Sequence, residues 1–129
     1  MKALLTAILL ATSSAALAVP KPTDPLPKEI LGCGGSIITE IGGRLEGDKN
    51  FSSGTSVGFK NGGWQVSYDK IEAIVKSKVG DHVLMCLVFI PNPKDCPPGD
   101  FRGRQYTTTN LRTLESWTLP DSQHNCGGA

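Results

Sequence analysis

The last nine residues, DSQHNCGGA, include side chains that hydrolases use for nucleophilic catalysis. Asp121, Ser122 and His124 are the residue types of a triad in which the acid orients the histidine and the histidine activates the serine. Such a triad needs the serine within hydrogen-bonding distance of the histidine. Side chains this close in an extended tail point in different directions, and the sequence has no G-x-S-x-G elbow. We therefore expect Asp121 and Ser122 to cap a turn after Pro120, with His124 on the surface.

The two histidines suggest a second kind of site. His82 and His124 are the only histidines, and together with Asp81 and Asp121 they could hold a metal ion if the fold brought them together. The sequence lacks the CxxC and HxxxH spacings that are typical of zinc sites, so we expect no metal and no cofactor. A glycosidase would need two paired carboxylates, and no pair stands out among Glu40, Glu46, Glu72 and Glu115.

The segment PNPKDCPPGDFRGR is the one that we expect to contact a ligand. Its prolines exclude regular structure, and long loops in small domains often carry function. Aromatic and arginine side chains are the types that anchor interfaces, and arginine can bind a carboxylate or phosphate through two hydrogen bonds. The predicted binding residues are Phe101, Arg102 and Arg104 of this loop, with Trp64 and Tyr68 of a preceding hairpin.

Four cysteines form an even set, which in an exported chain predicts two disulfides. The sequence CLVFIPNPKDC runs a strand into a proline turn that can fold back, which favours the pair Cys86–Cys96. The remaining pair, Cys33–Cys126, would then tie the two ends of the domain together. Closing a loop of that length would stabilise the fold by ~4 kcal/mol in the chain-entropy model.

Short apolar stretches separated by glycine and asparagine turns predict the elements that must position these residues. In GTSVGF-KNGG-WQVSY, alternating apolar residues flank Asn61-Gly62, which indicates a hairpin with a tight turn and an aromatic face. HVLMCLVFIP is apolar almost throughout and predicts a central strand covered on both sides. RQYTTTN and ESWTLP predict a second hairpin, with Tyr106 facing Trp117 or Leu119. DKIEAIVKSKVGD fits either a short helix with an Asp69–Glu72 capping box or a loop. The fold class is therefore mainly β, a small antiparallel barrel or sandwich with at most one short helix.

The first 18 residues have the pattern of a secretory signal peptide. One lysine precedes a short apolar run, and Ala16-Leu17-Ala18 places small residues at the cleavage positions, so we expect cleavage after Ala18. A lipid-anchored Cys33 is the weaker alternative, because charged and proline-rich sequence separates it from the apolar run. We expect a proline-rich, extended and mobile leader at residues 19–29 and a single β-domain at residues 30–129.

The charges and the missing motifs narrow the function. Without Lys2 the chain has 12 basic and 12 acidic residues, and no basic patch points to nucleic acid. No apolar run after the signal peptide is long enough to cross a membrane. The sequence therefore predicts a periplasmic or secreted binding protein, for example one that is inhibitor-like, whose partner is a protein or a cell-envelope component. The alternatives are an envelope hydrolase that uses His82 or His124 with a nearby acid, and a structural or stress-related envelope protein without a discrete site. An enzyme is the less favoured of these classes.

Overall fold

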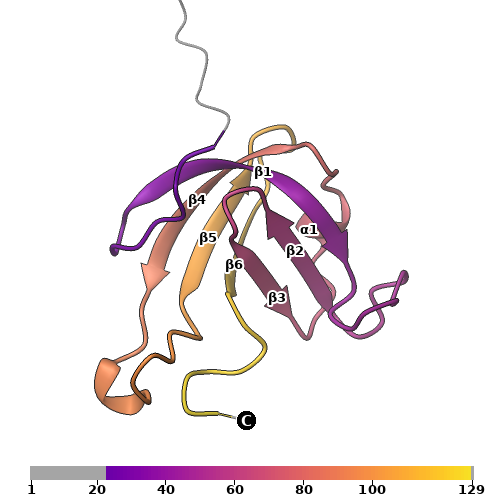
Figure 1. Ribbon diagram of the computed structural model, residues 1–129. Coiled ribbons are helices and arrows are strands. Elements are labelled where there is room, and N and C mark those ends of the chain that lie inside the picture. The colour runs from indigo at the N-terminus through magenta and orange to yellow at the C-terminus, as the bar shows by residue number, and fades with distance from the viewer. Residues whose placement is uncertain (1–22, 129) are drawn as a thin grey trace, which may run out of the picture.

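The computed structural model describes residues 23–128, which form one six-stranded antiparallel sheet curled into a half-barrel (Figure 1). The strands lie in the order β3-β2-β1-β4-β5-β6. The elements along the chain are β1 (Cys33–Gly42), β2 (Thr55–Phe59), β3 (Trp64–Ser67), α1 (Glu72–Val75), β4 (His82–Phe89), the 3-10 turn η1 (Pro93–Asp95), β5 (Gln105–Asn110) and β6 (Ser116–Pro120). The predicted fold class is confirmed. The expected signal peptide lies outside the described residues.

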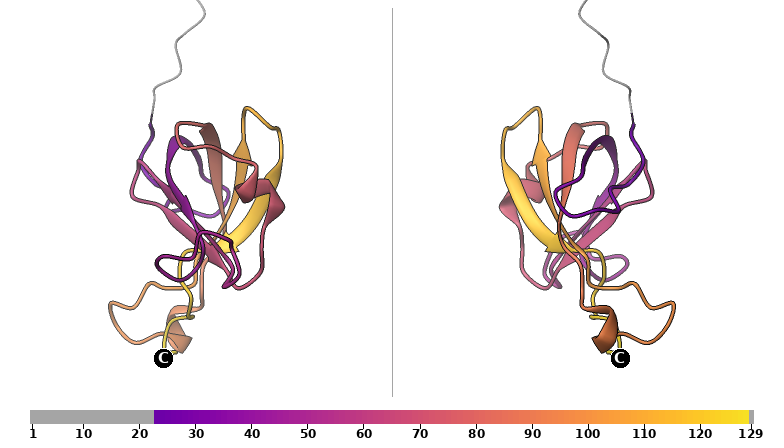
Figure 2. Two further views of the ribbon diagram at one scale, coloured as in Figure 1. Left: turned by 90° about the vertical axis from the view of Figure 1, so that its right-hand side faces the viewer. Right: turned by 90° about the vertical axis from the view of Figure 1, so that its left-hand side faces the viewer.

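The long strand β1 joins the two halves of the sheet. Its first half pairs with β4 and its second half with β2, and the pairing shifts by one residue between Ile38 and Glu40. A bulge of this kind bends a strand and increases its twist. The bend in β1 therefore lets the sheet curl around its inner face, as the end-on views in Figure 2 show.

The inner face of the curled sheet carries the hydrophobic core. The fully or almost fully buried side chains come from five strands and from the single turn of α1, which contacts both β2 and β6. They are Ile38, Val57, Phe59, Ile74, Val83, Met85, Leu87, Tyr106, Trp117 and Leu119. The predicted second hairpin is confirmed, with Tyr106 opposite Leu119 and Thr108 opposite Trp117. The short helix at α1 is present, but no side chain caps it, so the expected Asp69–Glu72 capping box is absent.

The first hairpin forms as predicted, but its register differs from the expected one. Within this turn only Gly62 has a positive φ, and the Phe59 amide donates a hydrogen bond to the Gly63 carbonyl. The loop of the hairpin therefore contains three residues rather than two. A shift of one residue in a hairpin moves every following side chain to the other face. Val57 is consequently opposite Gln65. Gln65 enters the core beside Phe59, whereas Trp64 is only partly buried and Tyr68 is exposed.

The amide of Gln65 closes the half-barrel where the backbone does not pair. Gln65 is fully buried. Its Oε1 accepts hydrogen bonds from Thr108 Oγ1 at 2.7 Å and from Trp117 Nε1 at 2.9 Å. Its Nε2 donates to the carbonyls of Tyr106 at 2.7 Å and Leu119 at 3.0 Å. One side chain of β3 therefore links that strand to both β5 and β6, at the opposite edge of the sheet order.

The outer face of β4 is not covered, which corrects the expectation of a strand buried on both sides. Burial alternates along β4, and Leu84, Val88 and Phe89 are exposed. The apolar run was interpreted as a two-sided core strand, but the only helix of the described residues lies on the inner side of the half-barrel, between β2 and β6. Alternate residues of β4 therefore face solvent.

All four cysteines form disulfides, but the expected pairing was wrong. The bonds are Cys33–Cys86 and Cys96–Cys126. Cys33 and Cys86 are direct partners across the β1–β4 ladder, and that neighbourhood places their sulfur atoms within bonding distance. Cys96 lies beyond the end of β4 in the loop, where it meets the tail.

The described part of the leader, residues 23–29, contacts the domain through hydrogen bonds and apolar packing. Asp24 exchanges hydrogen bonds with Gly35, through the Asp24 amide at 2.7 Å and the Asp24 carboxylate at 2.8 Å. Leu26 packs against the core, and the Pro27 carbonyl accepts a hydrogen bond from the Tyr106 hydroxyl at 3.3 Å. These residues cover one opening of the half-barrel.

Candidate binding surface formed by the loop and the tail

A long loop and the C-terminal tail together project beyond one end of the sheet (Figure 2). We call residues 90–104 and 121–128 the appendage. The Cys96–Cys126 disulfide joins its two segments. Backbone hydrogen bonds run beside it, from the Cys126 amide to the Arg102 carbonyl at 3.1 Å and from the Asp121 amide to the Arg104 carbonyl at 2.9 Å. The tail is thus built into the loop along its length.

Asp100 and Arg102 form an ion pair within the loop, and both residues also form hydrogen bonds to the end of the tail. Arg102 donates from Nε and Nη2 to the two carboxylate oxygens of Asp100, at 3.0 and 2.9 Å. The Gly127 amide bonds to the same carboxylate at 3.0 Å, and Arg102 also reaches the Gly128 carbonyl at 3.2 Å. The hydrogen bonds from Arg102 are the main reason that the pKa of Asp100 is lowered. Arg102, which we predicted to contact a ligand, therefore has its guanidinium engaged within the appendage.

Phe101 is an exposed side chain of the appendage, and the partly buried Arg104 lies beside it. The Phe101 side chain is 67% exposed, and the Arg104 guanidinium lies 5.3 Å from the centre of its ring. Beside them is a hollow of about 300 Å³ whose lining is mostly apolar. It is lined by Ile90, four prolines of the loop, Cys96, Gly99, Asp100, Phe101 and Arg104. A wider and shallower depression lies next to it, bordered by residues 98–102 and Asp121.

The other two predicted binding residues lie outside this cluster. Tyr68 is 59% exposed, and the Arg44 guanidinium stacks on its ring at 4.2 Å. Its hydroxyl donates to the Gln123 carbonyl at 3.4 Å, so it contacts the tail from the other side. Trp64 is at the opposite end of β3, paired with Gly58. The structure brings together Phe101, Arg102 and Arg104 and leaves Trp64 apart.

The structure does not assemble the catalytic arrangements considered from the sequence. The Ser122 hydroxyl donates to the backbone carbonyl of His124 and not to its imidazole. The Asp121 carboxylate accepts the Gly103 amide at 2.8 Å, and burial raises its pKa. His82 begins β4, whereas His124 lies in the appendage beyond the end of that strand, more than about 20 Å away at the usual rise per residue. The two histidines therefore do not converge.

The carboxylates considered for a glycosidase are dispersed. Glu72 pairs with Lys70 and Glu115 with Lys76, both on the surface. Glu40 and Glu46 are exposed around the loop that follows β1. Within residues 23–128, no group of three histidine, cysteine, aspartate or glutamate side chains is arranged to hold a metal ion.

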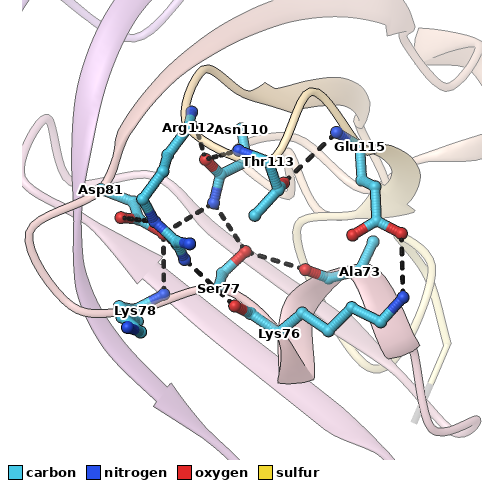
Figure 3. Close-up of polar contacts among 9 residues, drawn as sticks. All are labelled: Ala73, Lys76, Ser77, Lys78, Asp81, Asn110, Arg112, Thr113 and Glu115. Atoms are coloured by element: carbon cyan, nitrogen blue, oxygen red, sulfur yellow. Dashed lines mark hydrogen bonds and ion pairs between the residues drawn. The ribbon is translucent and has the colours of Figure 1, made fainter.

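A polar cluster at the opposite end of the sheet was not predicted (Figure 3). The carboxylate of Asp81 accepts hydrogen bonds from Arg112 Nε at 2.7 Å, from Arg112 Nη2 at 2.8 Å and from Asn110 Nδ2 at 2.8 Å. Asn110 also bonds to Ser77 at 2.8 Å, and Ser77 to the Ala73 carbonyl at the same distance. The Arg112 hydrogen bonds lower the pKa of Asp81. Sequence separation hid this cluster, because its members lie on and beside two different connections, one between α1 and β4 and one between β5 and β6.

These contacts give the polar cluster a structural role. They join the end of α1, the start of β4 and the turn between β5 and β6. Throughout the described residues, every buried side-chain nitrogen and oxygen has a hydrogen-bond partner. No buried polar group of the cluster is therefore left over to bind a ligand, and the appendage remains the better candidate site.

Residues 23–128 contain no helix long and apolar enough to cross a membrane. No family model, curated protein or solved structure matches the chain. The arguments about function therefore depend on the chain's own geometry.

Proposed function

We propose that the protein is exported to an oxidising compartment and works by binding a protein or a component of the cell envelope through the appendage. The two disulfides support export, because such bonds persist outside the reducing cytosol. The N-terminal sequence pattern supports it independently.

The observation that carries the binding proposal is the exposed Phe101 beside an apolar hollow in a loop that is already ordered. A disulfide, several prolines and the Asp100–Arg102 ion pair restrict the loop. A contact surface that is ordered before binding loses less conformational entropy on association. Aromatic and arginine side chains next to a depression are the usual anchors of such surfaces.

A retention experiment tests this proposal. Oxidised protein is immobilised and exposed to envelope extract, and any retained partner is then purified and titrated. We expect Phe101→Ala to weaken binding at least about tenfold, because buried aromatic anchors contribute more than about 1.4 kcal/mol. Leu114→Ala is the matched control: Leu114 is 76% exposed in the turn between β5 and β6, at the other end of the sheet.

Two outcomes would contradict the proposal. A partner that binds both variants equally would mean that the appendage is not the contact surface. Retention of no stoichiometric partner would favour a structural envelope protein without a discrete site.

A further inference from the structure

The hollow in the appendage combines an apolar interior with one unpaired positive charge. Its walls are Ile90, the proline rings and the Phe101 ring, and Arg104 contributes the cation. Asp100 also lines the hollow, but its carboxylate is already paired with Arg102. Among the described residues, no carboxylate lies within 4.0 Å of the Arg104 guanidinium. The other arginine of the loop is already neutralised by Asp100. The hollow is therefore suited to a ligand that presents an apolar group and an anion close together.

The two acidic groups in or near the hollow, Asp100 and Asp121, already have hydrogen-bond partners. Asp100 is bound by Arg102 and by the Gly127 amide. Asp121 accepts the Gly103 amide and borders the shallower depression instead of the hollow. Arg104 is consequently the charged group of the hollow that forms no close ion pair within the described residues, although Asp121 attracts it at longer range.

The position of the charge limits what kind of peptide can fit. In an extended peptide, successive side chains point to opposite faces, so an internal apolar residue and a neighbouring acidic residue cannot both enter one small hollow. The last residue of a chain differs, because its side chain and its α-carboxylate are attached to the same carbon atom. A volume of about 300 Å³ is at the small end of ligand sites and can take one such residue.

We propose that the hollow binds the C-terminal residue of a partner protein, with an apolar or aromatic side chain against Phe101 and the prolines and the α-carboxylate paired with Arg104. This inference rests on the proposed function, which makes the appendage the contact surface, and it specifies the chemistry of the partner. Capture of a chain end through its carboxylate is a recurring mode of peptide recognition.

Titration with two small probes tests the proposal on the oxidised protein. N-acetyl-L-phenylalanine carries the carboxylate, and N-acetyl-L-phenylalaninamide differs only in lacking the charge. In spectra of ¹⁵N-labelled protein, we expect the acid to shift backbone amides of residues 90–104. The amide should bind about threefold to fivefold more weakly, which is the effect of a charge pair at an exposed rim.

Two variants locate the effect. Arg104→Gln should abolish the difference between acid and amide, because it removes the cation. Lys60→Gln, which removes one positive charge in the first hairpin, should preserve the difference. Lys60 bonds to Ile37, the partner of His82 at the start of β4, and is therefore at the end of the sheet away from the appendage.

Several results would overturn the inference. Equal binding of acid and amide, no binding of either, or a difference that persists in Arg104→Gln would each exclude carboxylate recognition by Arg104. Binding of octanoate but of neither phenylalanine derivative would identify a lipid carboxylate as the occupant and refute a protein terminus. If a partner still depended on Phe101 after such a failure, the proposed function would stand and only the inference about chain ends would fall.

Discussion

Replacing Gln65 by leucine should remove the link that closes the half-barrel. Leucine keeps most of the apolar volume but cannot form the four hydrogen bonds of the Gln65 amide. The Thr108 hydroxyl and the Trp117 indole, which are 0% and 5% exposed as residues, would lose their acceptor in a dry environment. An unsatisfied buried donor costs roughly 1–3 kcal/mol. With two such donors, we expect the free energy of unfolding to fall by about 4 kcal/mol.

That loss is large compared with the total stability of about 5–15 kcal/mol that is usual for a domain. Urea unfolding followed by Trp fluorescence measures it, and the midpoint should fall by about 2 M or more for a chain of this size. Hydrogen exchange gives a local test: the Trp117 indole and the amides of β3 should exchange faster in the variant.

Gln105→Leu is the matched control. Gln105 is half-exposed and pairs with Pro120 at the end of the last hairpin. Surface substitutions of this kind usually change stability by less than about 0.5 kcal/mol. If Gln65→Leu unfolded within 1 kcal/mol of the wild type, the role assigned to the buried amide would be wrong.

Three further predictions concern the disulfides, the polar cluster and export. Tryptic mapping of the unreduced protein should link the peptide containing Cys33 to the one containing Cys86; a fragment linking Cys86 to Cys96 would contradict the structure. The folded-state pKa of Asp81 is depressed by Arg112, so its contribution to stability is present above the ordinary aspartate pKa of about 3.9 and is lost as the pH falls below it. Asp81→Asn should therefore destabilise the protein more at pH 7 than at pH 3 in urea unfolding, and an equal effect at both would refute this linkage. Mass spectrometry of the exported protein should show Val19 as the first residue and a mass that is four hydrogens lower than that of the reduced chain. A retained signal peptide would exclude the cleavage that we expect after Ala18.

The elements that could be predicted from the sequence are those set by local patterns. The hairpins were recognised because apolar residues flank asparagine and glycine turns, and both formed. The register of the first hairpin was missed because a three-residue loop and a two-residue turn share the sequence Asn61-Gly62. That difference of one residue determines whether Gln65 lies inside or outside.

Features that depend on the order of the strands could not be predicted. The partner of Cys33 is set by β1 lying next to β4, although 53 positions separate the two cysteines in the chain. The exposed face of β4 depends on the absence of a covering layer outside the described sheet, which the apolar sequence does not reveal. The cluster around Asp81 likewise needs two connections that are distant in the sequence to meet at one end of the sheet.

The candidate site was predicted in outline only. Residue type and loop length identified Phe101, Arg102 and Arg104 as one group, and the structure places them together in the appendage. Their different roles depend on Asp100, which binds one arginine and leaves the other accessible. Sequence alone treats the two arginines as equivalent.

The position of the tail has a practical consequence for handling the protein. Because Cys126 is bonded to Cys96 and the Gly127 amide contacts Asp100, this part of the tail lies against the loop that carries Phe101. A purification tag or fluorescent protein fused to the C-terminal tail would therefore lie close to the appendage and would obstruct it. A label is better attached at the exposed Leu114, at the far end of the sheet, which leaves the contacts of Arg112 and Asn110 in place.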